Sequence, residues 1–196
     1  METIKVSVKT LEEGLIVHCA PTLAGIKCAG LFNYFYSAEN IAREELHETN
    51  EVLNKKGVYV VPLVWKEKSV LIYVYRESML QKELSNIEVH ELLQSYGYDF
   101  GYKGNIIEQC IVNLKKRLAV CTCFPHEIGV FLGYPLEDVK GFIKNRGKNC
   151  KSCGVWKVYF DKEKKDKIFV KLNKCKDVYI KAFCEGRKIE KMTVSS

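Results

Sequence analysis

Residues 58–75 read VYVVPLVW, KEKS and VLIYVY in succession, and this stretch decides the fold. The segments 58–65 and 70–75 are rich in β-branched and aromatic side chains, which favour strands, and the polar segment 66–69 separates them. The pattern predicts an antiparallel β-hairpin. Pro62 has no backbone N–H to donate, so we expect it at a sheet edge or a bulge.

Helical and extended segments surround this hairpin. Further strands are expected at residues 3–9, within 20–35 and at 155–160. Helices are expected where apolar residues recur at helical spacing or where capping residues and prolines occur: at 10–19, stopped by Pro21; at 38–55, capped by Ser37 and closed by Gly57; from the capping box 85–88 to Gly97; at 107–118; at two short segments beginning at Pro125 and Pro135; and at 168–183.

The order of these elements predicts an α+β fold, with helices packed on a small antiparallel sheet and a helix-rich C-terminal half. A chain of 196 residues, 47% of them hydrophobic, can form one domain with its own core. We therefore expect a single domain over 1–196, with a possible subdivision into a mixed α/β part (1–84) and a helical part with one strand (85–196).

The composition and the N-terminal sequence also predict the cellular compartment. No apolar run approaches the roughly 18 residues that a membrane span needs, and the N-terminal residues lack the form of a signal peptide. These features predict a cytoplasmic protein with no membrane partner.

Positive charge is concentrated late in the chain. The formal net charge is +7, while residues 144–181 alone hold thirteen Lys or Arg and four Asp or Glu. Such a balance favours an anionic ligand, an acidic protein or, less readily, nucleic acid, although a Lys-rich helix face exposed to solvent would look the same. Lys27, Lys148 and Lys151 are candidate anion-binding residues.

The chain is cysteine-rich, with nine cysteines at irregular spacing. An odd count in a chain too long to need disulfide bonds argues against a disulfide framework. Five of the nine occur in apolar or helical contexts and are expected to be small buried side chains: Cys19, Cys28, Cys110, Cys175 and Cys184.

The pair Cys150 and Cys153, followed by Gly154, resembles half of a zinc ribbon. A second group, Cys121-Thr-Cys123-Phe-Pro-His126, could complete a four-ligand zinc or iron–sulfur site. Alternatively, the pair could be redox thiols, with nearby lysines stabilising a thiolate. Two ordinary thiols in a surface turn remain the simplest interpretation.

Two histidines are further candidates. His126 lies in the first turn of an expected helix, where the helix dipole disfavours its charged form, so a neutral imidazole could bind a metal or haem iron or act as a general base. His18 and Cys19 are adjacent and either could bind iron. His18 with Lys27, beside a turn containing glycine, could instead serve an enzyme acting on a small anionic substrate. Each residue could equally be structural.

The segment 127–143 has the core spacing of a DNA-binding helix-turn-helix. Its second helix would begin with Glu137 and Asp138, two carboxylates that would repel phosphate. Packing without DNA binding is therefore the favoured interpretation.

Three strings of this sequence, HCAPTLAGIK (18–27), FPHEIGVFLGYP (124–135) and GKNCKSCGVWKVY (147–159), resemble an uncharacterised family of clostridial and related anaerobic bacteria, a domain of unknown function. The resemblance runs over nearly the whole chain. It implies an anaerobic bacterial cytosol and, because relatives in this family lie near iron-uptake and flavodoxin genes, it favours a metal, haem or electron-transfer context over DNA binding. Cys121 and Cys123 fall outside these strings.

The resulting hypothesis is an accessory factor in iron, haem or thiol-redox handling, with Fe, haem or Zn as candidate cofactors. Its candidate site combines five residues: His18, Cys19, His126, Cys150 and Cys153. The alternative is a nucleic-acid-binding or regulatory protein that uses residues 127–143 and the basic C-terminal helix. The sequence leaves open whether the protein is an enzyme.

Overall fold

The computed structural model describes residues 9–100, 104–120 and 124–195, so most of the strand expected at 3–9 lies outside the described residues. Contacts within the chain cluster into two compact units. The first unit comprises residues 1–76 and 174–196, and the second comprises residues 77–173.

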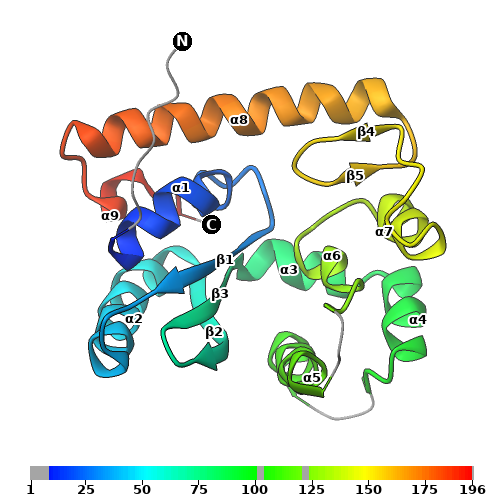
Figure 1. Ribbon diagram of the computed structural model, residues 1–196, viewed down its shortest axis with the longest axis horizontal. Helices are drawn as coiled ribbons and strands as arrows, with labels where there is room; N and C mark the ends of the chain where they lie inside the picture. Colours follow the sequence, from blue (N-terminus) through cyan, green and yellow to red (C-terminus); the bar gives the residue numbers. More distant parts are fainter. Residues whose placement is uncertain (1–8, 101–103, 121–123, 196) are drawn as a thin grey trace. The chain divides into compact units, whose positions relative to one another are not determined.

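The first unit is built on a three-stranded antiparallel sheet with strand order β1-β3-β2 (Figure 1). The predicted hairpin is confirmed. The elements of this unit are α1 (Leu11–Leu23), β1 (Ala29–Phe35), α2 (Glu39–Leu53), a short 3-10 helix (Asn54–Lys56), β2 (Val58–Lys66), β3 (Ser69–Arg76), the C-terminal part of α8 (Lys162–Cys184) and α9 (Ile189–Met192).

Pro62 lies on an edge strand and next to a bulge, as the sequence predicts. β2 is an edge strand of the sheet, and the pairing of β2 with β3 shifts by one residue between Pro62 and Val64. A residue without an N–H is tolerated at an edge and at a bulge because no ladder hydrogen bond is lost there.

The core of the first unit lies on one face of this sheet. Val70, Ile72 and Val74 alternate along β3 and are fully buried in a cluster with Leu15 of α1 and Leu46 of α2. Burying side chains of this size stabilises the fold by about 1.5–3 kcal/mol each.

Helix α1 departs from expectation because it continues through Pro21 to Leu23. A proline inside a helix removes one i to i−4 hydrogen bond. Pro21 lies in the last turn, where its carbonyl oxygen accepts hydrogen bonds from the backbone N–H groups of Ile26 and Lys27 at 3.0 and 3.1 Å. The helix ends at Leu23, two residues after Pro21, whereas the sequence predicts an end before Pro21.

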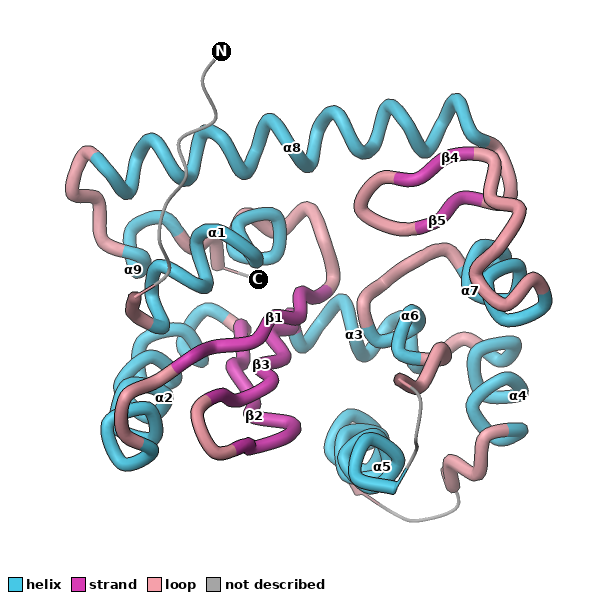
Figure 2. Tube along the Cα trace, in the orientation of Figure 1, coloured by secondary structure: helices cyan, strands magenta, loops and turns pink. Residues whose placement is uncertain are grey.

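The second unit is mainly helical, which confirms the α+β class and the helix-rich C-terminal half. Its elements are α3 (Glu77–Leu84), α4 (Ile87–Ser95), α5 (Ile106–Val120), α6 (Ile128–Phe131), α7 (Leu136–Lys144), β4 (Ser152–Cys153), β5 (Lys157–Val158) and the N-terminal part of α8 (Figure 2). The cap residues of α2 and α4 are Ala38 and Asn86, each one position after the serine expected from the sequence.

The strand expected at 155–160 is wrong in its bounds. β4 and β5 form a two-stranded antiparallel hairpin, and Val155 and Trp156 lie in its turn. The apolar character of this segment reflects packing of the turn rather than a longer strand.

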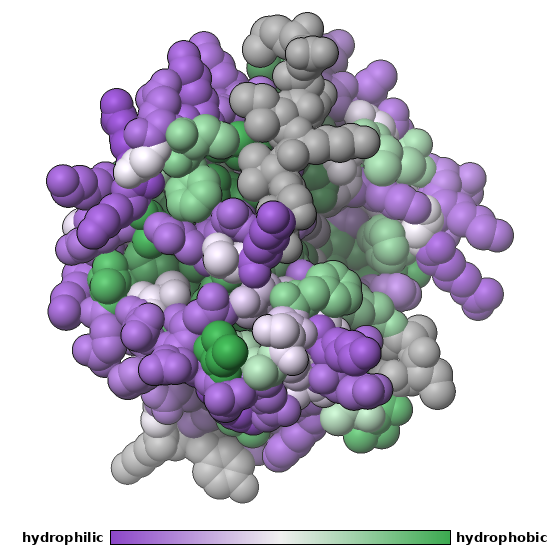
Figure 3. Space-filling model, turned by 60° about the vertical axis from the view of Figure 1, so that its left-hand side comes forward, coloured by the Kyte–Doolittle hydropathy of each residue, from purple (hydrophilic) through white to green (hydrophobic). Residues whose placement is uncertain are grey.

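No helix among the described residues is long and apolar enough to cross a membrane. The face of the molecule drawn in Figure 3 is covered mostly by hydrophilic side chains, with apolar side chains in small groups.

A buried arginine joins three segments of the first unit. Arg76, at the end of β3, is only 2% exposed. Its guanidinium donates hydrogen bonds of 2.6 Å to the carbonyl oxygens of Thr22, Leu23 and Val194. Because Thr22 and Leu23 end α1, the cation also faces the negative end of that helix dipole. One side chain thus joins α1, β3 and the C-terminal segment.

Replacing Arg76 by methionine should lower the free energy of unfolding by about 3 kcal/mol, because three carbonyl groups lose a charged donor. Urea unfolding measures the loss. Arg43→Met is the matched control: Arg43 is exposed, pairs with Glu39 at 2.7 Å and lies over the Trp65 ring at 4.3 Å, so its loss should cost about 1 kcal/mol. Equal losses for the two variants would contradict the role assigned to Arg76.

Candidate functional site

A pocket of about 310 Å³ lies in the second unit, between the α6–α7 segment and the β4–β5 hairpin. We call it the Trp156 pocket. Its lining residues are Phe124, His126, Ile128, Gly129, Tyr134, Asp138, Val139, Phe142, Cys153, Gly154, Val155, Trp156 and Lys157. The volume is near the lower end of the roughly 300–1,000 Å³ that is typical of ligand pockets.

The hairpin turn forms one wall of this pocket. Cys153 and Lys157 are paired across the two strands, and the backbone N–H of Gly154 donates to the carbonyl oxygen of Trp156 at 3.1 Å. Gly154 is required for space, since a Cβ atom there would overlap the ring of Phe169. The sequence suggested a glycine knuckle around a metal, whereas the close approach of an aromatic ring explains this glycine.

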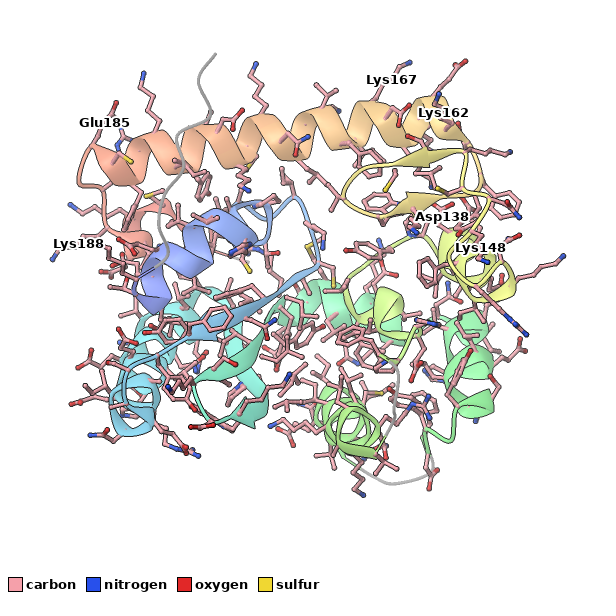
Figure 4. The ribbon with its side chains drawn as sticks, in the orientation of Figure 1. Asp138, Lys148, Lys162, Lys167, Glu185 and Lys188 are labelled. Atoms are coloured by element: carbon pink, nitrogen blue, oxygen red, sulfur yellow. The ribbon has the colours of Figure 1, made fainter. Side chains whose placement is uncertain are left out.

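Asp138 fixes the hairpin to the first turn of α7. It is 1% exposed. Its Oδ1 accepts hydrogen bonds from the backbone N–H groups of Tyr159 (2.8 Å) and Phe160 (3.1 Å), and its Oδ2 accepts one from the indole N–H of Trp156 (2.9 Å). Figure 4 shows Asp138 on α7, beside the hairpin. A buried carboxylate is stable only when it is paired or hydrogen-bonded in this way.

Aromatic side chains hold the walls rigid. The ring of Trp156 stacks on Tyr134 at 5.0 Å between centroids and meets the edge of Phe169 at 4.6 Å. On another side of the pocket, His126 meets Phe142 edge-on at 5.0 Å. Each such pair contributes about 0.5–1.5 kcal/mol beyond its buried area, so the pocket is largely preformed.

Three side chains give the pocket its chemistry. His126 supplies an imidazole, Cys153 an exposed thiol and Lys157 an ammonium group. Lys157 is held in place because its Nζ donates to the carbonyl oxygen of Gly147 at 2.8 Å and lies 5.8 Å from the ring centroid of Phe142. Of the five candidates for a metal or thiol site, the structure thus brings His126 and Cys153 together in one pocket.

His18 and Cys19 belong to the first unit, where Cys19 is a core residue. Cys19 is fully buried, and burial raises the pKa of its thiol to about 12. His18 stacks on Phe32 at 5.2 Å, and desolvation, together with the charge of Lys176, lowers the pKa of its imidazole. Burial therefore keeps Cys19 in its thiol form at neutral pH.

Lys27, also in the first unit, is half-buried beside two thiols. Its ammonium donates a hydrogen bond to the carbonyl oxygen of Ala29. Burial lowers the pKa of Lys27 to about 8, and the neighbouring Cys19 and Cys28 act in the opposite direction.

The remaining candidates lie in the second unit but do not line the pocket. Cys150 is half-buried; burial raises the pKa of the nearby Tyr159 hydroxyl, and Cys150 and Asp138 add to that shift. Lys148 and Lys151 are exposed, with Lys151 Nζ 5.8 Å from the ring centroid of Phe160. Within residues 9–100, 104–120 and 124–195, no group of three or more His, Cys, Asp or Glu side chains could hold a metal ion. Cys121 and Cys123 lie outside the described residues.

The helix-turn-helix pattern corresponds to α6 and α7, but α6 has only four residues. The two carboxylates at the start of α7 have partners within the unit. Asp138 bonds the hairpin, and Glu137 pairs with Lys165 of α8 at 3.1 Å. The first turn of α7, the helix that would contact DNA, is therefore held by contacts within the protein.

Sequence reasoning missed the residues that build the site. Asp138 was considered only for its charge, and Trp156 and Lys157 only as part of a strand. Glu127 is fully buried and paired with Arg117. An acidic residue in a helix turn just after a proline was the one local signal available for Asp138.

Comparison with known proteins adds the family but no activity. Residues 15–193 match a family model described as Protein of unknown function (DUF3793). The chain belongs to this family. Searches of curated proteins and of solved structures return no significant match. The predicted membership of a family of unknown function is thereby confirmed.

Asp138→Asn should lower the free energy of unfolding by about 2–3 kcal/mol, since an amide cannot accept all three hydrogen bonds as the carboxylate does. Urea unfolding measures the loss, and the emission of Trp156, read in a Trp65→Phe background, should shift with it. Glu88→Gln, which removes an exposed ion pair with Lys140, is the control and should cost under about 1 kcal/mol. If Asp138→Asn left the free energy of unfolding unchanged, the role assigned to Asp138 would be wrong.

The lowered pKa of Lys27 predicts a pH dependence. Between pH 8 and pH 10.5 the unfolded chain retains a proton at Lys27 that the folded chain has released, so this group adds stability as pH rises through that window. The stability of a Lys27→Met variant relative to wild type should accordingly decline from pH 8 to pH 10.5. Urea unfolding across this range measures the difference in free energy of unfolding between the two proteins. A difference that stayed constant with pH would show that burial does not lower the pKa of Lys27.

Proposed function

We propose that the protein is a cytosolic accessory factor of iron, haem or thiol handling that binds a small ligand with a flat apolar body in the Trp156 pocket. One observation carries the proposal: His126 and Cys153, from separate segments of the chain, line a single pocket with aromatic walls. Pockets of this kind, with apolar walls and a few convergent polar groups, are the usual sites for small ligands.

The side chains that line the pocket favour a ligand held by one or two protein atoms over a structural metal ion held by four. A structural zinc ion needs four protein ligands, whereas haem iron can be held by a single histidine or cysteine. His126 and Cys153 can each supply one such bond. The same thiol, as its thiolate, could instead attack a ligand that carries a disulfide, forming a mixed disulfide while the other sulfur of the ligand leaves as a thiolate. The resemblance to a family of anaerobic bacteria supports this setting, because free thiols and ferrous iron persist there.

Nucleic-acid binding through residues 127–143 receives less support. Asp138 and Glu137, at the start of the helix that would enter a DNA groove, are held by the hairpin and by Lys165. A positively charged chain can still bind DNA weakly and without sequence preference. A salt titration on duplex DNA separates such binding from a specific role.

The chain carries only two tryptophans, so Trp65→Phe leaves Trp156 as the sole indole reporter. In this background, haem and compact planar aromatic compounds should quench Trp156 emission in a saturable manner. His126→Ala or Cys153→Ser should weaken haem binding about tenfold or more and alter its absorbance spectrum, because one of the two side chains that would hold the iron is lost.

Cys184→Ser provides the matched control, since Cys184 is an exposed thiol in the first unit and outside the pocket. It should leave affinity unchanged. Absence of saturable quenching with every compound would refute ligand binding in the pocket. Equal effects of Cys153→Ser and Cys184→Ser, with no effect of His126→Ala, would refute the iron and thiol roles.

A further inference from the structure

We propose that the ligand of the Trp156 pocket is an aromatic anion, and that Lys157 receives its negatively charged group. This inference rests on the proposed function of the pocket and adds the charge class of the ligand. It assigns the site to a small molecule that carries a carboxylate, sulfonate or phosphate group next to a flat apolar body.

The segment 144–157, whose last five residues line the pocket, carries only positive charge. Residues 144–157 contain five Lys or Arg and no Asp or Glu. Four of these cations are exposed and Lys157 is half-buried within the lining. Charges of one sign beside a low-dielectric wall raise the local concentration of an oppositely charged ligand.

Lys157 is positioned to contact such a ligand. Its bond to the carbonyl oxygen of Gly147 uses one of the three N–H donors of an ammonium group, so up to two can serve a ligand. That bond and the ring of Phe142 fix the end of an otherwise flexible side chain. A held cation loses little entropy when an anion binds to it.

Asp138, the acidic side chain of the lining, does not oppose an anion as a free carboxylate would. Both of its oxygens accept hydrogen bonds from the hairpin. It also lies in the first turn of α7, where the helix dipole offsets negative charge. The rings of Trp156, Tyr134 and Phe142 complete the site with surfaces for an aromatic body.

A pair of matched probes tests the inference: 8-anilino-1-naphthalenesulfonate and its uncharged parent, N-phenyl-1-naphthylamine. Affinities are measured by quenching of Trp156 in the Trp65→Phe background. Lys157→Gln should weaken sulfonate binding about tenfold, as expected for loss of one charge-assisted hydrogen bond, and change binding of the neutral probe by less than about twofold. Lys157→Arg should retain the sulfonate affinity.

Lys167→Gln is the control, because Lys167 is an exposed lysine of α8 that Figure 4 shows projecting from the helix, and it does not line the pocket. It should change neither affinity. If both probes bind and Lys157→Gln leaves the sulfonate affinity unchanged, the anion inference is wrong while the pocket stands. Equal weakening of both probes would assign Lys157 a structural role and overturn the inference as well. If neither probe quenches Trp156 but haem does, the anion inference is wrong while the proposed function stands; if haem also fails to quench, the proposed function itself fails.

Discussion

The hydrogen bonds of the buried Asp138 carboxylate are the interaction on which the Trp156 pocket depends. Burying a charge is costly unless its oxygens are hydrogen-bonded, and Asp138 meets this condition with two backbone N–H groups and one indole N–H. All three donors come from the hairpin segment, while the acceptor belongs to α7. The spacing between hairpin and helix is thereby fixed, and aromatic side chains fill that space without closing it.

Local patterns predicted the parts of the fold that local physics controls. The hairpin at 58–75, the bulge at Pro62 and the long helices follow from side-chain alternation, helical periodicity and backbone chemistry within a few residues. Gly57 and Gly97 end their helices in the left-handed conformation that glycine favours. These features need no knowledge of what packs against them, so the α+β class could be predicted from the sequence.

Tertiary contacts decided the rest. Trp156 lies in a turn because Asp138, Tyr134 and Phe169 hold its ring, and these partners are distant in sequence. α1 continues through Pro21 to Leu23, and residues beyond the helix, including Arg76, bond the carbonyl groups of its last turn. The candidate residues were chosen by type alone, and chain spacing could not indicate that Cys153 lines a pocket and Cys150 does not. Only the packing of the hairpin separates these two thiols.

The central claim, that the Trp156 pocket is a ligand site held together by Asp138, is tested most directly by two-dimensional ¹H–¹⁵N NMR. The two indole N–H resonances report on Trp156 and Trp65 separately. On addition of haem or a compact aromatic anion, the account predicts saturable shifts of the Trp156 indole and of the amides of residues 152–158, with the Trp65 indole unchanged. Shifts of Trp65 alone, or none at the hairpin, would contradict it.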